Sequence, residues 1–280
     1  MSVEIAPALM YHDVVPAGAE DSSGFPGRDA ALYKITPQLF DTHLAAMMGR
    51  VGRAGLHDSC HRHGLHDARG LPRPRAPLIS FDDGGISAMA AADLLERRGL
   101  SGCFFVTVNC LGSRRFLSVP QLRDLRRRGH LVGSHSCSHP LRMGHCAPGR
   151  VLEEWTRSRA VLADALGEEP ADASLPGGDF APLVAEAAAM AGFTRLFTSE
   201  PVLVPRCAYG LILHGRFTIR RWTSARTAAA LAAGDWTACT RQAAAWTLRK
   251  IGKHLGGRRY LELRRLLLRH GNELRWGDQR

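Results

Sequence analysis

Long apolar runs are missing from this sequence. No stretch approaches the ~18 uncharged apolar residues that a membrane-spanning helix needs. The opening residues, MSVEIAPALMYHDVV, also lack the basic start, the apolar centre and the small-residue cleavage site of a secretory signal. From these absences we expect a cytoplasmic protein without a membrane-spanning segment.

Paired cysteines are absent as well. The seven cysteines are an odd number, and none stands in a Cys-x-x-Cys pattern. This spacing argues against both a disulfide framework and a structural zinc knuckle. We therefore expect reduced thiols.

Acidic residues are scarce near the C-terminus. Residues 241–280 hold eleven Lys or Arg against three Asp or Glu, a net charge of +8 out of +11 for the whole chain. The excess charge is therefore typical of an appended basic segment. No basic patch interleaved with aromatic residues is found, so we expect no nucleic-acid partner.

Strand-like and helix-like segments alternate over most of the chain. Apolar runs such as residues 77–81 (PLISF) and 102–108 (GCFFVTV) precede segments of helical spacing, and Thr36 with Pro37 marks the start of a helix. This order predicts parallel strands with helical crossovers. Six or more such units favour a closed or nearly closed β/α barrel, with an open sheet as the alternative.

Polar clusters fall where the expected strands end, which is where a β/α barrel gathers its chemistry. The clusters are Tyr11-His12-Asp13, Asp82-Asp83, His135 to His139, and Pro176-Gly177-Gly178.

Two adjacent carboxylates in SFDDGG, Asp82 and Asp83, repel each other at the end of an apolar run. One interpretation is a capped turn, because Asp-Gly is common in turns. The other is a site where a cation or a reacting group uses both carboxylates.

The stretch GSHSCSHP favours the second interpretation. His135 and His139 are spaced to bind one metal ion, and Gly133 and Pro140 place them in a loop at a strand end. One Asp and two His leave positions open for water and substrate. The second carboxylate is then available as the general base.

At these residues the sequence resembles the polysaccharide deacetylases with a NodB-type homology domain, carbohydrate esterase family 4. The resemblance rests on SFDDG, HSCSH and, more loosely, SLPGGDF, and it extends roughly from Pro7 to Arg221 with the early MYHDVVP. It implies an α/β fold, a distorted (β/α)7 barrel over residues 1–222, and leaves 223–280 as a basic helical extension. It also implies removal of N- or O-acetyl groups from sugars with a divalent metal.

The resemblance assigns roles position by position. Asp82 matches the catalytic base of the family. Asp83, His135 and His139 match its metal ligands, and Pro176-Gly177-Gly178 matches the loop whose backbone N–H stabilises the oxyanion.

The sequence departs from the family in three motifs. Ser174 stands where the family has an Arg that orients the catalytic Asp, and Gly177 stands where it has an aromatic residue. The Asp and Trp pair of the fourth motif has no clear counterpart. The general acid of the fifth motif is matched in letters by His214 in LILH, and His12 is a second candidate. These departures leave open a catalytically degraded carbohydrate-binding or scaffold protein on the same fold.

Further expectations concern metals and partners. The metal is expected to be Zn²⁺, with Co²⁺, Ni²⁺ and Mn²⁺ as alternatives. The expected substrate is an acetylated amino-sugar glycan or a lipid-linked saccharide in surface polysaccharide or glycolipid biosynthesis. Residues 238–280 either pack on the barrel or contact an anionic membrane at its inner face. Residues 57–67, with four His and one Cys, are a polar loop or a second metal site.

Overall fold

The computed structural model describes residues 7–52 and 77–251. The chain forms two compact units, Met1–Cys239 and Thr240–Arg280. Within the described residues, no helix has both the length and the apolar character required to cross a membrane. The histidine-rich stretch at 57–67 and the tail at 252–280 lie outside the described residues.

One nine-stranded sheet lies in the described part of the chain, in the order β7-β8-β6-β5-β4-β3-β2-β1-β9. The strands are β1 (Ala8–Tyr11), β2 (Leu78–Phe81), β3 (Cys103–Val106), β4 (Leu131–Ser134), β5 (Asp172–Ser174), β6 (Arg195–Phe197), β7 (Arg206–Ala208), β8 (Leu211–His214) and β9 (Phe217–Thr218). Neighbours are parallel throughout, except that β7 and β8 form an antiparallel pair. The predicted parallel arrangement is confirmed.

The seventh parallel strand is divided, and the division closes the sheet. β8 pairs with β6, whereas β9 pairs with β1 through Leu9↔Phe217 and Met10↔Thr218. Only Gly215 and Arg216 separate β8 from β9, so residues 211–218 join the two sides of the sheet. The expected distorted (β/α)7 barrel is therefore confirmed in its nearly closed form.

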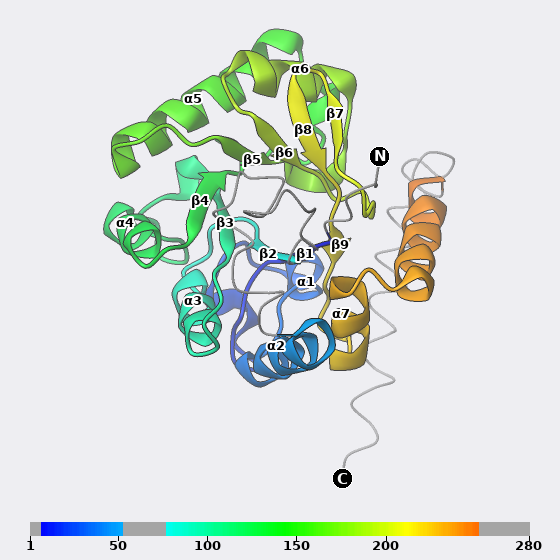
Figure 1. The fold of residues 1–280 in the computed structure, drawn as a ribbon. Coiled ribbons are helices and arrows are strands. Elements are labelled where there is room, and N and C mark those ends of the chain that lie inside the picture. The colour runs from blue at the N-terminus through cyan, green and yellow to red at the C-terminus, as the bar shows by residue number, and fades with distance from the viewer. Residues whose placement is uncertain (1–6, 53–76, 252–280) are drawn as a thin grey trace, which may run out of the picture. The chain divides into compact units, whose positions relative to one another are not determined.

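Helices cover the outer face of the curved sheet (Figure 1). They are α1 (Arg28–Ala31), α2 (Pro37–Val51), α3 (Ala88–Glu96), α4 (Val119–Arg127), α5 (Pro148–Leu166), α6 (Pro182–Met190) and α7 (Ala225–Ala232). The 3₁₀ turns are η1 (Glu20–Ser22), η3 (Val108–Cys110), η4 (Met143–His145) and η5 (Pro176–Gly178). The side chain of Thr36 accepts a hydrogen bond from the Leu39 N–H at 3.2 Å, as expected for a helix start.

Side chains of β2 point alternately to the apolar core under the helices and to the inside of the barrel. Ile79 and Phe81 lie in the apolar core beneath the helices. Because side chains alternate along a strand, Ser80 and then Asp82 face the inside of the barrel. The interior near the carboxyl ends of the strands is therefore polar.

Helix α7 belongs to the barrel unit. Its Ala228 and Leu231 are buried in the same core cluster as Leu44 and Met47 of α2. The boundary between the compact units follows Cys239. The domain limit expected at residue 222 stays a prediction. The sequence of α7 is rich in alanine, and its pattern did not predict that the helix would pack against α2. The chain is also helical over 236–251, in line with the expected helical character of this region.

Candidate metal centre and active site

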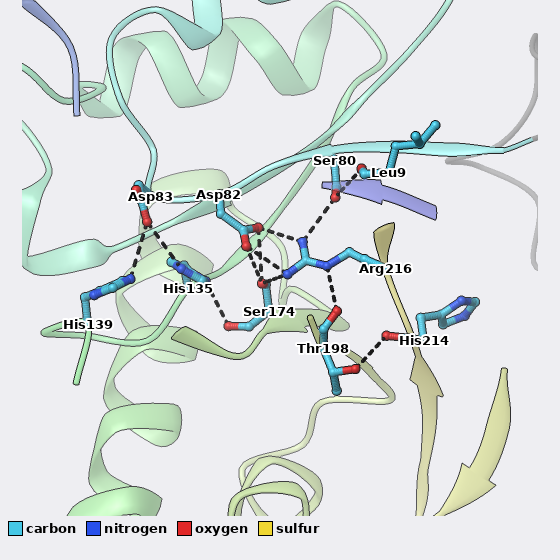
Figure 2. A network of polar contacts seen from close by, with 10 residues as sticks. All are labelled: Leu9, Ser80, Asp82, Asp83, His135, His139, Ser174, Thr198, His214 and Arg216. Carbon is cyan, nitrogen blue, oxygen red and sulfur yellow. Dashed lines mark hydrogen bonds and ion pairs between the residues drawn. The ribbon is translucent and has the colours of Figure 1, made fainter. Parts of the chain in front are cut away.

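The turn after β2 separates the two carboxylates. Asp83 has a left-handed backbone with φ of +75°, and Gly84 follows with φ of +79°. A Cβ at Gly84 would lie 2.8 Å from Val106 Cγ1, so this tight turn requires glycine. The turn directs Asp82 and Asp83 to different neighbours, and both are buried (Figure 2).

Asp83 meets the two histidines. Its Oδ1 lies 3.4 Å from Nε2 of His135 and 3.4 Å from Nε2 of His139, and one ligand atom of each residue lies within 4.8 Å of the others. Ligands at 2.0–2.1 Å from a tetrahedral zinc ion are about 3.4 Å apart, so the two distances from Asp83 to the histidines match those of such a site. The structure brings together the three ligands predicted from the sequence.

Hydrogen bonding orients His135 for this role. Its Nδ1 is 3.0 Å from the carbonyl oxygen of Ser174. A carbonyl only accepts, so Nδ1 carries a proton, and Nε2, which faces Asp83, is the nitrogen that could bind a metal. Burial alone would lower the pKa of His135, but the Asp82 and Asp83 carboxylates raise it above its usual value.

The loop between the histidines is strained and held from α5. Ser136 and His139 both have positive φ, 64° and 56°. The carboxylate of Glu154 accepts from the N–H groups of Cys137 and Ser138 at 2.9 and 2.8 Å. It also accepts from the Ser138 hydroxyl at 2.6 Å. These bonds stabilise a conformation that is rare for non-glycine residues.

Asp82 is paired with an arginine. Arg216 Nη1 and Nη2 lie 2.7 and 2.8 Å from Oδ1 and Oδ2 of Asp82, a bidentate geometry, and Arg216 is fully buried (Figure 2). The Ser174 hydroxyl lies 3.1 Å from the same carboxylate and accepts from Arg216 at 2.7 Å. Burial would raise the pKa of Asp82, but Arg216 and then His135 hold it below its usual value. The carboxylate is therefore ionised at neutral pH.

Arg216 is the functional residue that the sequence reasoning missed. It supplies the guanidinium that the family pattern would place at position 174, and it comes from the join between β8 and β9. Its other donors reach the Ser80 hydroxyl and the Thr198 carbonyl at 3.1 Å each. No local pattern in LILHGRFTI showed which residue Arg216 pairs with, because the strand is interrupted between His214 and Phe217.

The two candidate acids lie in different places. His214 stacks on Phe197 with ring centroids 4.9 Å apart, and Figure 2 shows its ring directed away from Asp82. Its backbone carbonyl accepts from Thr198. His12 lies at the end of β1, close enough to contribute electrostatically to the lowered pKa of both Asp82 and Asp83. Its buried Nδ1 has no hydrogen-bond partner among the described residues.

The predicted oxyanion loop follows β5. Gly177 and Gly178 have φ of +66° and +71° within η5. A Cβ at Gly177 would lie 2.3 Å from the Leu141 carbonyl oxygen, so an aromatic residue at this position would require a different turn. The loop begins two residues after Ser174, which contacts Asp82. Its role as an N–H donor stays a prediction.

Comparisons with known proteins found similar sequences among the polysaccharide deacetylases. Residues 70–196 match the family model for polysaccharide deacetylase. Over these residues, which are somewhat less than half of the chain, the protein is similar to polysaccharide deacetylases. The Bacillus subtilis protein YxkH, named for the same family, is 24% identical over 131 residues, which are 46% of this chain and 47% of the relative. The chain thus matches about half the length of that relative.

Solved deacetylase structures share the fold. The Streptococcus pyogenes deacetylase PplD, in complex with acetate, aligns over 80% of this chain and 96% of its own, with a TM-score of 0.62 and 20% identity. IcaB from Ammonifex degensii aligns over 82% and 97%, with a TM-score of 0.61 and 22% identity. At these identities the likeness shows the fold. The resemblance drawn from the sequence motifs is confirmed at the level of the family and the architecture.

Proposed function

We propose that this protein is a metal-dependent deacetylase, a hydrolase that removes the acetyl group from an N-acetylated sugar of a glycan. One observation carries the proposal. A three-residue metal-binding donor set and an ionised carboxylate held by a buried arginine stand side by side at the carboxyl end of the barrel. A protein that only bound sugar would have no use for a base beside a metal ligand.

Asp83, His135 and His139 would hold the metal. A divalent ion bound there would supply Lewis-acid polarisation of the acetyl carbonyl and of a water molecule. Two nitrogen ligands and one oxygen ligand suit zinc, and cobalt, nickel and manganese are the alternatives. The identity of the ion is part of the proposal.

Asp82 is the proposed general base. Its ionised carboxylate takes a proton from the attacking water as the water oxygen bonds to the acetyl carbon. Arg216 and Ser174 fix its orientation, so the carboxylate is pre-organised before the substrate binds. The backbone of Gly177 is the proposed donor to the developing oxyanion.

The leaving nitrogen needs a proton when the carbon–nitrogen bond breaks. We assign this role to His12, because it lies at the end of β1 and acts electrostatically on both carboxylates. His214, the other candidate, is turned toward Phe197. The products are acetate and a free amino sugar.

Acetate release from N-acetylglucosamine tetramers, with each metal added in turn, tests the proposal. We expect release that depends on metal and falls sharply in His12→Ala but much less in His214→Ala. If no metal binds and no acetate is released from N- or O-acetylated glycans, the proposal fails. The alternative of a catalytically degraded binding protein then holds.

The finer expectations about place and substrate form also belong to this proposal. We propose a lipid-linked or cytosolic saccharide precursor as substrate, and contact of the basic tail with the inner membrane face in the cytoplasm. The charge of the last forty residues supports this, because basic segments are attracted to anionic lipid.

A further inference from the structure

A row of aromatic and cationic side chains leads away from His12. The ring of Tyr33 lies 4.8 Å from the ring of His12, centroid to centroid. The guanidinium of Arg220 lies over Tyr33 at 5.8 Å and over the ring of Trp222 at 5.6 Å. His12, Tyr33, Arg220 and Trp222 therefore form a continuous series from the candidate acid outward.

The fold brings these residues together from two loops. Tyr33 follows β1 in the chain and Arg220 follows β9, and these two strands are parallel neighbours. The N–H of Arg221 donates to the carbonyl of Leu32 at 3.0 Å, which ties one loop to the other. Both loops leave the carboxyl end of the barrel, where substrates of such folds bind.

Trp222 has the exposure expected of a binding surface. It is 51% exposed, whereas Tyr33 and Arg220 in the same series are half-buried. The indole of Trp222 offers a large, rigid and apolar contact area beside the proposed glycan site. Such an aromatic face suits the apolar C–H face of a pyranose ring. Arg220 holds the indole from one side.

Arg220 adds a charge preference. Within the described residues, the guanidinium of Arg220 forms no ion pair and no hydrogen bond. Its backbone N–H donates to Thr223 Oγ1 at 3.0 Å. Other arginines at this end of the molecule differ: Arg221, for example, lies 3.6 Å from Glu20. A planar guanidinium that is held in place and not neutralised is suited to a carboxylate or a phosphate.

We propose that Tyr33, Arg220 and Trp222 form a sugar-binding subsite that accepts an acidic unit of the glycan next to the N-acetylated unit. The inference rests on the proposed function and narrows its substrate class to anionic glycans. Trp222 stacks on the pyranose, and Arg220 pairs with its carboxylate or phosphate.

The test is calorimetric titration of the full-length Asp82→Asn protein, which limits turnover, with three tetrasaccharide probes. A hyaluronan tetrasaccharide presents carboxylates, a neutral N-acetylglucosamine tetramer presents no charge, and the same tetramer with a phosphate at its reducing end presents a phosphate. The two acidic probes should bind more tightly than the neutral one, and their ranking identifies the acid. Raising the salt concentration should weaken only the acidic probes.

Variants separate the two contacts. Trp222→Ala should weaken all three probes about tenfold, as expected when one aromatic contact is lost. Arg220→Gln should weaken the acidic probes about tenfold and leave the neutral probe within twofold. Trp236→Ala, at a tryptophan that is 76% exposed elsewhere, and Arg226→Gln, at an exposed arginine of α7, are matched controls and should change nothing.

Equal affinity for acidic and neutral probes, or affinities unchanged by both variants, would overturn the subsite. The KM for acetate release by otherwise wild-type protein is a second measurement, and it should rise in Trp222→Ala while kcat stays constant. A protein that binds the acidic probes through Arg220 and Trp222 but releases no acetate would support the subsite and reject the hydrolase. The two failures are thus distinguishable.

Discussion

Asp82 and Arg216 depend on each other inside the barrel. Both are buried, and each would be an uncompensated charge without the other. Removing one partner of a buried ion pair commonly costs about 3–5 kcal/mol. The pair therefore affects both the stability of the barrel and the protonation state of the proposed base.

Replacing Asp82 by Asn tests the base itself. The amide cannot take a proton from water, so kcat for acetate release should fall by roughly 10² or more. The ligands Asp83, His135 and His139 are untouched, so elemental analysis should still find the metal. A variant that deacetylates at the wild-type rate would remove Asp82 from the mechanism.

Replacing Arg216 tests the positioning of the base. Arg216→Met leaves Asp82 buried without its partner and should lower the free energy of unfolding by about 3–5 kcal/mol, measured in urea. Arg216→Lys keeps the charge but loses the bidentate geometry, so it should fold, bind metal and lose kcat with little change in KM. Unchanged kcat in the folded Lys variant would make the pair purely structural.

The sequence predicted some of these residues for a physical reason. Local signals mark Asp82, Asp83, His135 and His139, because these polar residues follow apolar strands directly. The two strands, β2 and β4, are parallel and separated by β3, so their carboxyl ends lie at the same edge of the sheet. Arg216 is 134 residues from Asp82, and their pairing arises only when β8 is divided from β9. No local pattern carries that information.

At the scale of elements, α5 supports the loop that bears the metal ligands. Glu154 extends from α5 to Cys137 and Ser138 between the two histidines. Burial would raise the pKa of Glu154, but the hydrogen bonds from Ser138 and the charge of Arg150 hold it below its usual value. The ionised carboxylate is therefore the form that stabilises the loop.

Glu154→Gln should lower the free energy of unfolding by about 1.5–3 kcal/mol at pH 7, because hydrogen bonds to a charge are lost. The folded pKa lies below the unfolded value of about 4.3, so the contribution is complete above that pH and is lost as pH falls through the folded pKa. Denaturation at pH 7 and pH 3.5 should show the difference shrink in acid. Glu153→Gln, at the neighbouring exposed position, is the control, and an equal effect there would contradict the prediction.

The start of α2 was predictable, whereas strand β7 was not. Thr36 and Pro37 marked the helix start because a capping residue and a proline precede apolar residues at helical spacing. Strand β7 has three residues, of which Arg206 and Cys207 are exposed. It therefore has neither the alternating apolar pattern nor the buried face by which a strand is predicted. Its antiparallel pairing with β8 was not predicted.

At the scale of the whole molecule, two truncations test the unit boundary. A chain ending after Cys239 keeps α7 on α2 and should unfold cooperatively, near the midpoint of the full chain. A chain ending after Trp222 loses α7 and leaves Leu44 and Met47 of α2 uncovered, so thermal unfolding by circular dichroism should show a much lower midpoint. Equal unfolding midpoints for the two truncated chains would support a domain boundary at residue 222.

The basic tail yields a separate expectation. Each basic residue near an anionic leaflet contributes about 1 kcal/mol, so the full chain should sediment weakly with anionic liposomes and be released by salt. Deleting residues 240–280 should abolish this binding, and neutral liposomes serve as the control. Binding that does not depend on salt, or that persists after the deletion, would contradict membrane contact and favour packing of the tail on the barrel.

The divided seventh strand has one more consequence. The contact of β9 with β1 consists of two paired positions and the Ile219 N–H bond to Met10, so it is a short seam, and Arg216 is located directly beside it. Local separation of β9 from β1 would move the Arg216 guanidinium away from Asp82. Opening of the barrel at this position would therefore also inactivate the proposed base. Amide hydrogen exchange at Phe217 and Ile219 should therefore report on the readiness of the base.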